Sequence, residues 1–269
     1  MKSGIIGAKD LIFDAHLEVV KNGRVPPAAA GVLVDEEFGA SVARRAKADG
    51  APLAMPVEKS GQDEFQFEYG DDFGQHIESF DPTFAKVLVR YNPEGDVELN
   101  KRQEERLVRL SRWLRKHDRK FLFELLVPAT TEQLDRYEDS GAYDKELRPS
   151  LVVEAIHALQ TAGVEPDVWK IEGIDLADDC QKVVTQARSE GRYGVACIIL
   201  GRGADEAKVF HWLQVAASVP GFHGFAVGRT IWYDALARFL AGHGSRDDAV
   251  KSIAERYQEM YDTYVGDDR

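Results

Sequence analysis

Short apolar runs separated by longer, charge-rich segments dominate the hydrophobic pattern of the chain. The runs lie at 11–15 (LIFDA), 31–35 (GVLVD), 52–58 (PLAMPVE), 84–91 (FAKVLVRY), 120–128 (KFLFELLVP), 167–172 (DVWKIE), 194–200 (GVACIIL) and 224–228 (GFAVG). Runs of this length, bounded by turn residues, are typical of buried strands. We therefore predict eight strands.

The segments between the runs have the spacing of amphipathic helices. The clearest cover residues 100–117, 151–163, 205–219 and 245–265. Gly163 is a typical helix end, and Ser245 with an acid three residues later is a typical helix start. Strands that alternate with helices form a parallel sheet.

The simplest closed form of this alternation is a (β/α)₈ TIM barrel, predicted as a single domain over residues 1–269 with an extra C-terminal helix. The alternative is an open doubly wound sheet. The first predicted strand is not followed by the G-x-G-x-x-G turn that would favour that alternative.

Charge narrows the classes of partner. Forty-six acidic residues against 34 basic ones give a formal net charge of −12, which disfavours nucleic acid or an anionic membrane as the main partner. An anionic metabolite needs only a local group of donors. The sequence MKSGIIGAKD does not resemble a signal peptide, and two cysteines make neither a disulfide framework nor a zinc cluster, so we expect a cytoplasmic protein.

Charged residues interrupt three of the predicted strands at positions that share a face. Side chains alternate along a strand, so Trp169 and Ile171 would face the helices while Lys170 and Glu172 face the barrel interior. The same alternation turns Lys86 and Arg90 inward from 84–91, and Glu124 inward from 120–128.

A structural ion network is the simplest interpretation of any one of these charges. Together they favour catalysis, because burying each charge costs several kcal/mol unless pairing or function compensates. A desolvated lysine near another cation has a lowered pKa, and its free amine can attack a carbonyl to form a Schiff base. We predict Lys170 as nucleophile, Glu124 as acid and base, and Lys86 as the polarising cation.

Two glycine-arginine pairs follow the last two predicted strands. Gly201, Arg202 and Gly203 follow the first, and Gly228 and Arg229 follow the second. TIM barrels frequently bind phosphate at these two loops. Glycine lets backbone N–H groups approach the oxygens, and an arginine adds a forked contact.

Other polar residues are ambiguous between function and structure. Asp35 and Glu58 end two predicted strands and are candidates for contacts with substrate hydroxyls, while Asp14 and His16 near 11–15 carry no assigned role. The seven histidines lack H-x-H, H-x-x-H and H-E-x-x-H spacing, which disfavours zinc chemistry, so we predict no metal and no cofactor.

Several motifs resemble those of class I, Schiff-base aldolases of the tagatose-1,6-bisphosphate aldolase type. DEEFG and PVEKSG are similar to motifs of that type, and LIFDAH, AKVLVRYNPEGD, PDVWKIEG and GFAVGRTIW resemble the aldolase-like domain fused to 5-dehydro-2-deoxygluconokinase. FDAH and EKSG depart from that domain's usual pattern. The resemblance implies Lys170 as the Schiff-base lysine, Lys86 and Glu124 beside it, and phosphate near Gly201, Gly203, Gly228 and Arg229.

We therefore predict a metal-independent aldolase that cleaves a phosphorylated ketose or keto-sugar acid, releasing dihydroxyacetone phosphate and an aldehyde. Arg90, Arg202, Glu172, Asp35 and Glu58 are further candidates for substrate contacts. Three alternatives stay open: a Schiff-base lyase or isomerase, a non-catalytic phosphosugar-binding barrel, and a metal-dependent aldolase. The amphipathic terminal helix fits packing on its own barrel or on a partner subunit in a homo-oligomer.

Overall fold

A computed structural model describes residues 2–137 and 139–266. The described residues form a curled sheet of seven parallel strands in the order β1-β2-β3-β4-β5-β6-β7. The strands are β1 (Val32–Leu33), β2 (Leu53–Pro56), β3 (Phe84–Arg90), β4 (Lys120–Leu126), β5 (Val168–Glu172), β6 (Ala196–Leu200) and β7 (Phe222–Phe225).

Helix α1 precedes the first strand, and one or more helices follow each strand. They are α1 (Lys2–Lys21), α2 (Glu36–Ala48), α3 (Phe73–Phe80), α4 (Val97–Lys116), α5 (Thr131–Arg136), α6 (Ser140–Glu146), α7 (Arg148–Ala162), α8 (Ala177–Ala187), α9 (Glu206–Ala217), α10 (Arg229–Leu240) and α11 (Arg246–Val265). Short 3₁₀ turns occupy Pro27–Ala29, Gly70–Asp72 and Ser189–Gly191. Gly163 ends α7 in the left-handed conformation, and Ser245 caps α11 in a capping box with Asp248.

The predicted strand at 11–15 is wrong, because these residues lie within helix α1. Leu11, Ala15 and Val19 recur every four residues and pack with α10 and α11, while Phe13 packs on the other side with residues of α2 and β2. A short apolar run cannot distinguish a strand from a helix that is buried on two sides. Asp14 and His16 consequently lie on a helix, where Asp14 pairs with Arg45 and Arg246.

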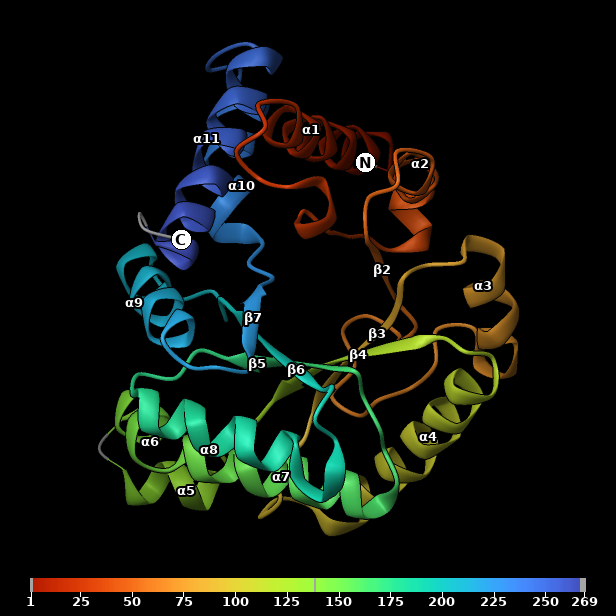
Figure 1. Cartoon of the computed structure of the whole chain (residues 1–269), viewed down its shortest axis with the longest axis vertical. Coiled ribbons are helices and arrows are strands. Elements are labelled where there is room, and N and C mark those ends of the chain that lie inside the picture. Colours follow the sequence, from red (N-terminus) through yellow and green to blue (C-terminus); the bar gives the residue numbers. More distant parts are fainter. Residues whose placement is uncertain (1, 138, 267–269) are drawn as a thin grey trace.

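Seven strands form a half-barrel, where eight strands in a closed barrel were expected. Among the described residues β1 pairs with β2 and β7 pairs with β6, but β1 and β7 do not pair with each other. Helices α1, α10 and α11 pack together between these two edge strands (Figure 1). The alternating α/β order and the parallel sheet are confirmed.

The main core lies between the sheet and its outer helices. Alternate strand residues such as Val87, Phe123 and Trp169 contribute to it, together with Leu107 and Leu110 of α4. Their strand neighbours Lys86, Glu124 and Lys170 therefore face the concave side of the sheet. No helix in the described part of the chain is long and apolar enough to cross a membrane.

Candidate active site

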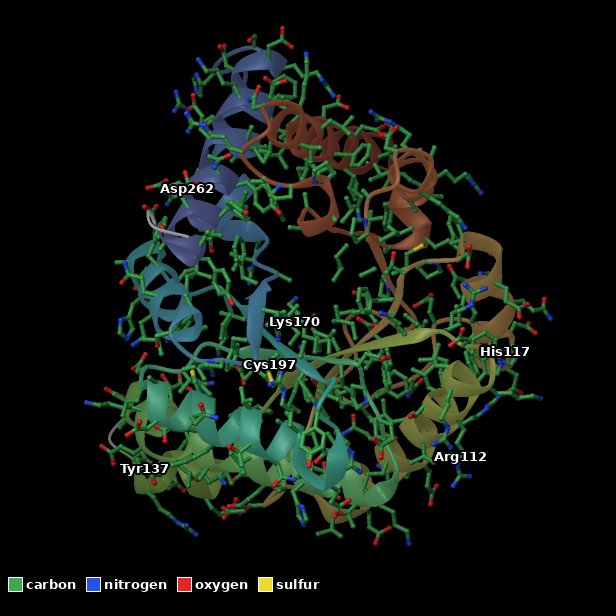
Figure 2. All side chains as sticks on the ribbon, viewed as in Figure 1. Arg112, His117, Tyr137, Lys170, Cys197 and Asp262 are labelled. Atoms are coloured by element: carbon green, nitrogen blue, oxygen red, sulfur yellow. The ribbon has the colours of Figure 1, made fainter. Side chains whose placement is uncertain are left out.

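The charged residues of three neighbouring strands meet near the middle of the sheet. Glu124 of β4 lies directly opposite Lys170 of β5, and Lys86 of β3 lies opposite Leu122, two residues before Glu124. Because side chains at paired positions of a sheet share a face, both lysines reach the same carboxylate. Figure 2 shows Lys170 near the centre of the molecule, whereas Tyr137 and Asp262 lie at its periphery.

Four side chains form an alternating ion chain. Lys170 Nζ lies 2.9 Å from Glu124 Oε1, and Lys86 Nζ lies 3.0 Å from Glu124 Oε2. Lys86 Nζ also donates to Glu58 Oε1 at 2.5 Å. The side chains of these residues are only 6–11% exposed. The structure therefore places Glu58, Lys86, Glu124 and Lys170, hereafter the inner ion chain, in a single buried row.

Glu58 enters the inner ion chain from the end of β2, where the sequence suggested only a contact to substrate. Its second oxygen, Oε2, is buried and has no hydrogen-bond partner among the described residues. A buried carboxylate oxygen without a partner is costly in the ionised state. Burial raises the pKa of Glu58, an effect that the attraction of Lys86 does not overcome.

Burial also lowers the pKa of Lys170, because the charged ammonium loses its hydration. Glu124 opposes this effect, while the nearby positive charge of Lys86 adds to it. The amine is therefore shifted toward its neutral, nucleophilic form. This is the electrostatic environment that a Schiff-base lysine requires.

Lys86 and Glu124 are shifted in the opposite sense, toward their charged forms. Burial works against the charge of Lys86, but Glu58 and Glu124 together raise its pKa. Burial likewise works against the charge of Glu124, but Lys86 and Lys170 together lower its pKa. Taken together, the four pKa shifts favour a charged pair of Lys86 and Glu124. On either side of this pair, Glu58 and Lys170 are shifted toward their neutral forms.

The two predicted glycine loops lie against each other at the ends of β6 and β7. A Cβ added to Gly201 would lie 3.1 Å from Val227, and one added to Gly203 would lie 2.8 Å from the Arg229 guanidinium. Gly203 also has a φ of +73°, which favours glycine. The two loops therefore lie side by side, and the phosphate contact predicted for them stays a prediction.

The N-termini of the two following helices differ. Asp205 caps α9 by accepting a hydrogen bond from the Lys208 N–H at 2.9 Å. Gly228 stands at the N-cap of α10 and has no side chain to do the same. An incoming anion would compete with a carboxylate at α9 but not at α10.

Three further candidate residues are held by partners outside the inner ion chain. Asp35 caps α2 through the Phe38 N–H at 2.8 Å and pairs with Lys9. Arg90 donates to the Gln62 carbonyl at 2.9 Å. Arg202 lies within the first glycine loop and pairs with Glu172 at 2.7 Å and with Asp144. Asp35 therefore has a structural role that accounts for its position.

Sequence reasoning missed Asp144, Arg148 and Tyr143. Arg148 is 2% exposed and starts α7, and its Nε donates to Asp144 at 3.0 Å. Tyr143 is buried and donates to the Val127 carbonyl at 2.9 Å. All three come from a stretch without a strand-like run, where the sequence alone gives no sign of contact with β5. Nowhere in the described residues are three His, Cys, Asp or Glu side chains grouped as a metal ion would require.

Comparison with known families gives one match over nearly the whole chain. Residues 2–267 match the DUF2090 family, described as an uncharacterized protein conserved in bacteria. The chain belongs to the DUF2090 family. No curated protein matches the sequence.

Solved structures share the fold of this DUF2090 member at low sequence identity. A Schiff-base-forming fructose-1,6-bisphosphate aldolase is 17% identical with a TM-score of 0.58, covering 94% of this chain and 82% of its own. The protein Cgl0159 from Corynebacterium glutamicum is 15% identical with a TM-score of 0.62, covering 95% and 76%. A fructose-bisphosphate aldolase from Slackia heliotrinireducens is 12% identical with a TM-score of 0.56, covering 92% and 76%. The DUF2090 chain therefore has the fold of aldolase-like TIM barrels.

Proposed function

We propose that the protein is a metal-independent class I aldolase that forms a Schiff base at Lys170. The observation that carries this proposal is the contact of Lys170 Nζ with Glu124 Oε1 at 2.9 Å, in a buried row where Lys86 supplies a second positive charge. Burial and Lys86 favour the neutral amine. A structural neighbour is itself a Schiff-base-forming aldolase, which supports the same chemistry on this fold.

In this mechanism the Lys170 amine attacks the substrate ketone and forms a carbinolamine. Loss of water gives an iminium, which accepts the electron pair released when the adjacent carbon-carbon bond breaks. Glu124 takes the proton from the hydroxyl of the departing carbon, so that this carbon leaves as an aldehyde. The remaining enamine is protonated and hydrolysed, which frees the ketone product and regenerates the amine.

The proposed substrate class rests on the loops that follow β6 and β7. Gly201, Gly203, Gly228 and Arg229 would bind a phosphate group, with the uncapped N-terminus of α10 favouring the anion. The substrate would be a phosphorylated ketose or keto-sugar acid, such as a tagatose bisphosphate or a 2-deoxy-5-keto-gluconate 6-phosphate. Cleavage would then release dihydroxyacetone phosphate and an aldehyde.

A cleavage assay tests this function. Phosphorylated ketoses and keto-sugar acids are incubated with the protein, and triose phosphate release is followed with a coupled dehydrogenase. Activity that survives EDTA and disappears in Lys170→Met supports the proposal. Activity that EDTA abolishes and Lys170→Met retains would show a metal-dependent aldolase, and binding of sugar phosphates without any turnover would show a binding protein.

A further inference from the structure

Glu172 is buried at the end of β5, two residues beyond Lys170, yet no ion pair joins these two residues in the described part of the chain. Its side chain is 3% exposed. One oxygen accepts the Val127 N–H at 2.9 Å, and the other lies 2.7 Å from Arg202 Nε. Glu172 therefore links the ends of β4, β5 and β6 and takes no part in the inner ion chain.

Three more side chains complete a second charged group, hereafter the rim network of Glu172, Arg202, Asp144 and Arg148. Asp144 accepts from both arginines, and Arg148 Nη2 donates to the Gly173 carbonyl at 2.7 Å. Arg148 Nη1 lies 4.0 Å from Glu172 Oε2 and has no hydrogen-bond partner among the described residues. Two positive and two negative charges thus surround the start of the loop that follows β6.

The backbone of that loop is in a conformation that needs support. Arg202 has a φ of 48°, in the left-handed region that residues with a Cβ rarely adopt. Such a conformation persists where the surroundings hold it. The side chain of Arg202 is anchored on Glu172 and Asp144, and the next residue, Gly203, lies against the Arg229 guanidinium.

The two arginines of the glycine loops therefore differ in availability. Arg202 is engaged by two carboxylates, and its side chain is 31% exposed. Arg229 is exposed and makes no ion pair with any described residue. An anion that approaches both loops would meet an unpaired guanidinium only at Arg229.

We propose that Glu172, Asp144 and Arg148 are positioning residues that hold Arg202, and with it residues 201–204, in a preformed anion-binding conformation against Arg229. Arg229 is then the arginine that contacts the anionic group of the ligand. Arg202 does not contact the ligand but helps to hold the loop in its conformation. This assignment rests on the proposed phosphosugar function for its ligand class.

The test is a calorimetric titration of inorganic phosphate into the full-length protein and its variants. If the rim network positions the loop, Glu172→Gln and Asp144→Asn each weaken phosphate binding by roughly tenfold, and Arg229→Met weakens it at least as much. If instead Glu172 merely withholds Arg202 from the ligand, Glu172→Gln tightens binding. The two explanations therefore predict opposite changes in phosphate affinity for Glu172→Gln.

Matched variants separate positioning from general loss of stability. Glu165 forms a bidentate ion pair with Arg192, with both contacts at 2.8 Å. Glu165→Gln should leave phosphate affinity unchanged. Arg202→Lys keeps a charge for Glu172 and should lose less affinity than Arg202→Met. Tighter phosphate binding in Glu172→Gln, or no phosphate binding by the wild type, overturns the proposal.

A second assay distinguishes failure of the proposed aldolase function from failure of the positioning role. Borohydride trapping with unphosphorylated dihydroxyacetone reports on Lys170 without using the anion site. Glu172→Gln should trap this ketone at the wild-type rate while KM for a phosphorylated substrate rises more than kcat falls. Equal loss of trapping and of phosphate affinity in Glu172→Gln would contradict a positioning role.

Discussion

Glu124 contacts Lys170 through Oε1 at 2.9 Å and Lys86 through Oε2 at 3.0 Å. One carboxylate therefore holds two lysines whose pKa values move in opposite directions, down for Lys170 and up for Lys86. The difference arises because Lys86 has a second carboxylate, Glu58, and Lys170 does not. This asymmetry is what the proposed roles of Lys170 as nucleophile and Lys86 as fixed cation require.

Replacing Glu124 should separate imine formation from bond cleavage. In Glu124→Gln the amine of Lys170 loses the carboxylate that favours its charge, so it should still react with a ketone. Proton transfer during cleavage should fail, with a fall in kcat of about 10²–10⁴-fold. Borohydride trapping and the cleavage assay measure the two steps, with the exposed Glu98→Gln as control. Loss of both steps to the same extent would argue against an acid-base role.

Removing Lys86 should move the pH dependence of Lys170. The positive charge of Lys86 helps to lower the pKa of Lys170, so Lys86→Met should raise that pKa and shift the acidic limb of the trapping rate to higher pH. The rate at pH 7 should fall as a result. Trapping rates measured from pH 6 to 10 test this shift. If the acidic limb of the pH profile stays where it is in the wild type, Lys86 does not influence the pKa of Lys170.

Lys170→Met should stabilise the fold or leave its stability unchanged. Because the folded-state pKa of Lys170 is lowered, the folded state binds fewer protons than the unfolded state at neutral pH, and wild type carries a cost that methionine lacks. Glu124 keeps Lys86 as a partner. We expect a gain of about 0–2 kcal/mol at pH 7, which fades as the pH approaches the usual lysine value.

Urea denaturation of wild type and Lys170→Met measures this difference. A purely structural ion pair predicts the opposite result, a loss of about 3–5 kcal/mol when one buried partner is removed.

Gly173→Ala should destabilise the protein and disturb the rim network. An added Cβ would lie 1.9 Å from the Trp212 ring, too close to fit without movement of β5 or α9. Overpacking of this kind costs about 1–3 kcal/mol. Gly194 has open space around it and is the matched control. Similar stability in Gly173→Ala and Gly194→Ala, by urea denaturation, would contradict this contact.

Glu64 should contribute stability that depends on acid pH. Arg102 and Arg106 lower the pKa of Glu64 to about 2 from its usual 4.5. A depressed carboxyl pKa stabilises the fold above the unfolded value and loses that contribution as the pH falls through the folded value. Wild type should therefore exceed Glu64→Gln in Tm at pH 6, with the gap closing between pH 4.5 and 2. A gap that does not depend on pH would refute this.

The alternation of strand residues was enough to predict that Lys86, Glu124 and Lys170 share the inner face, because burial of Trp169 on the outer face leaves Lys170 only the inner one. The contact of Glu58 with Lys86 was not predicted, because Glu58 lies beyond the end of β2. The helix at 2–21 could not be predicted, because the apolar spacing of LIFDA suits either a strand or a helix packed on two sides. The rim network was also beyond the sequence. Asp144 and Arg148 lie on α6 and α7, and their contacts with β5 and the loop after β6 depend on how those helices pack.

The most direct test of the central claim is borohydride reduction in the presence of dihydroxyacetone phosphate, followed by mass mapping of peptides. The account predicts one stable adduct, on the peptide that carries Lys170, and none in Lys170→Met. An adduct on Lys86 would reverse the assignment of the two lysines, and the absence of any adduct under conditions where substrate is cleaved would contradict Schiff-base catalysis.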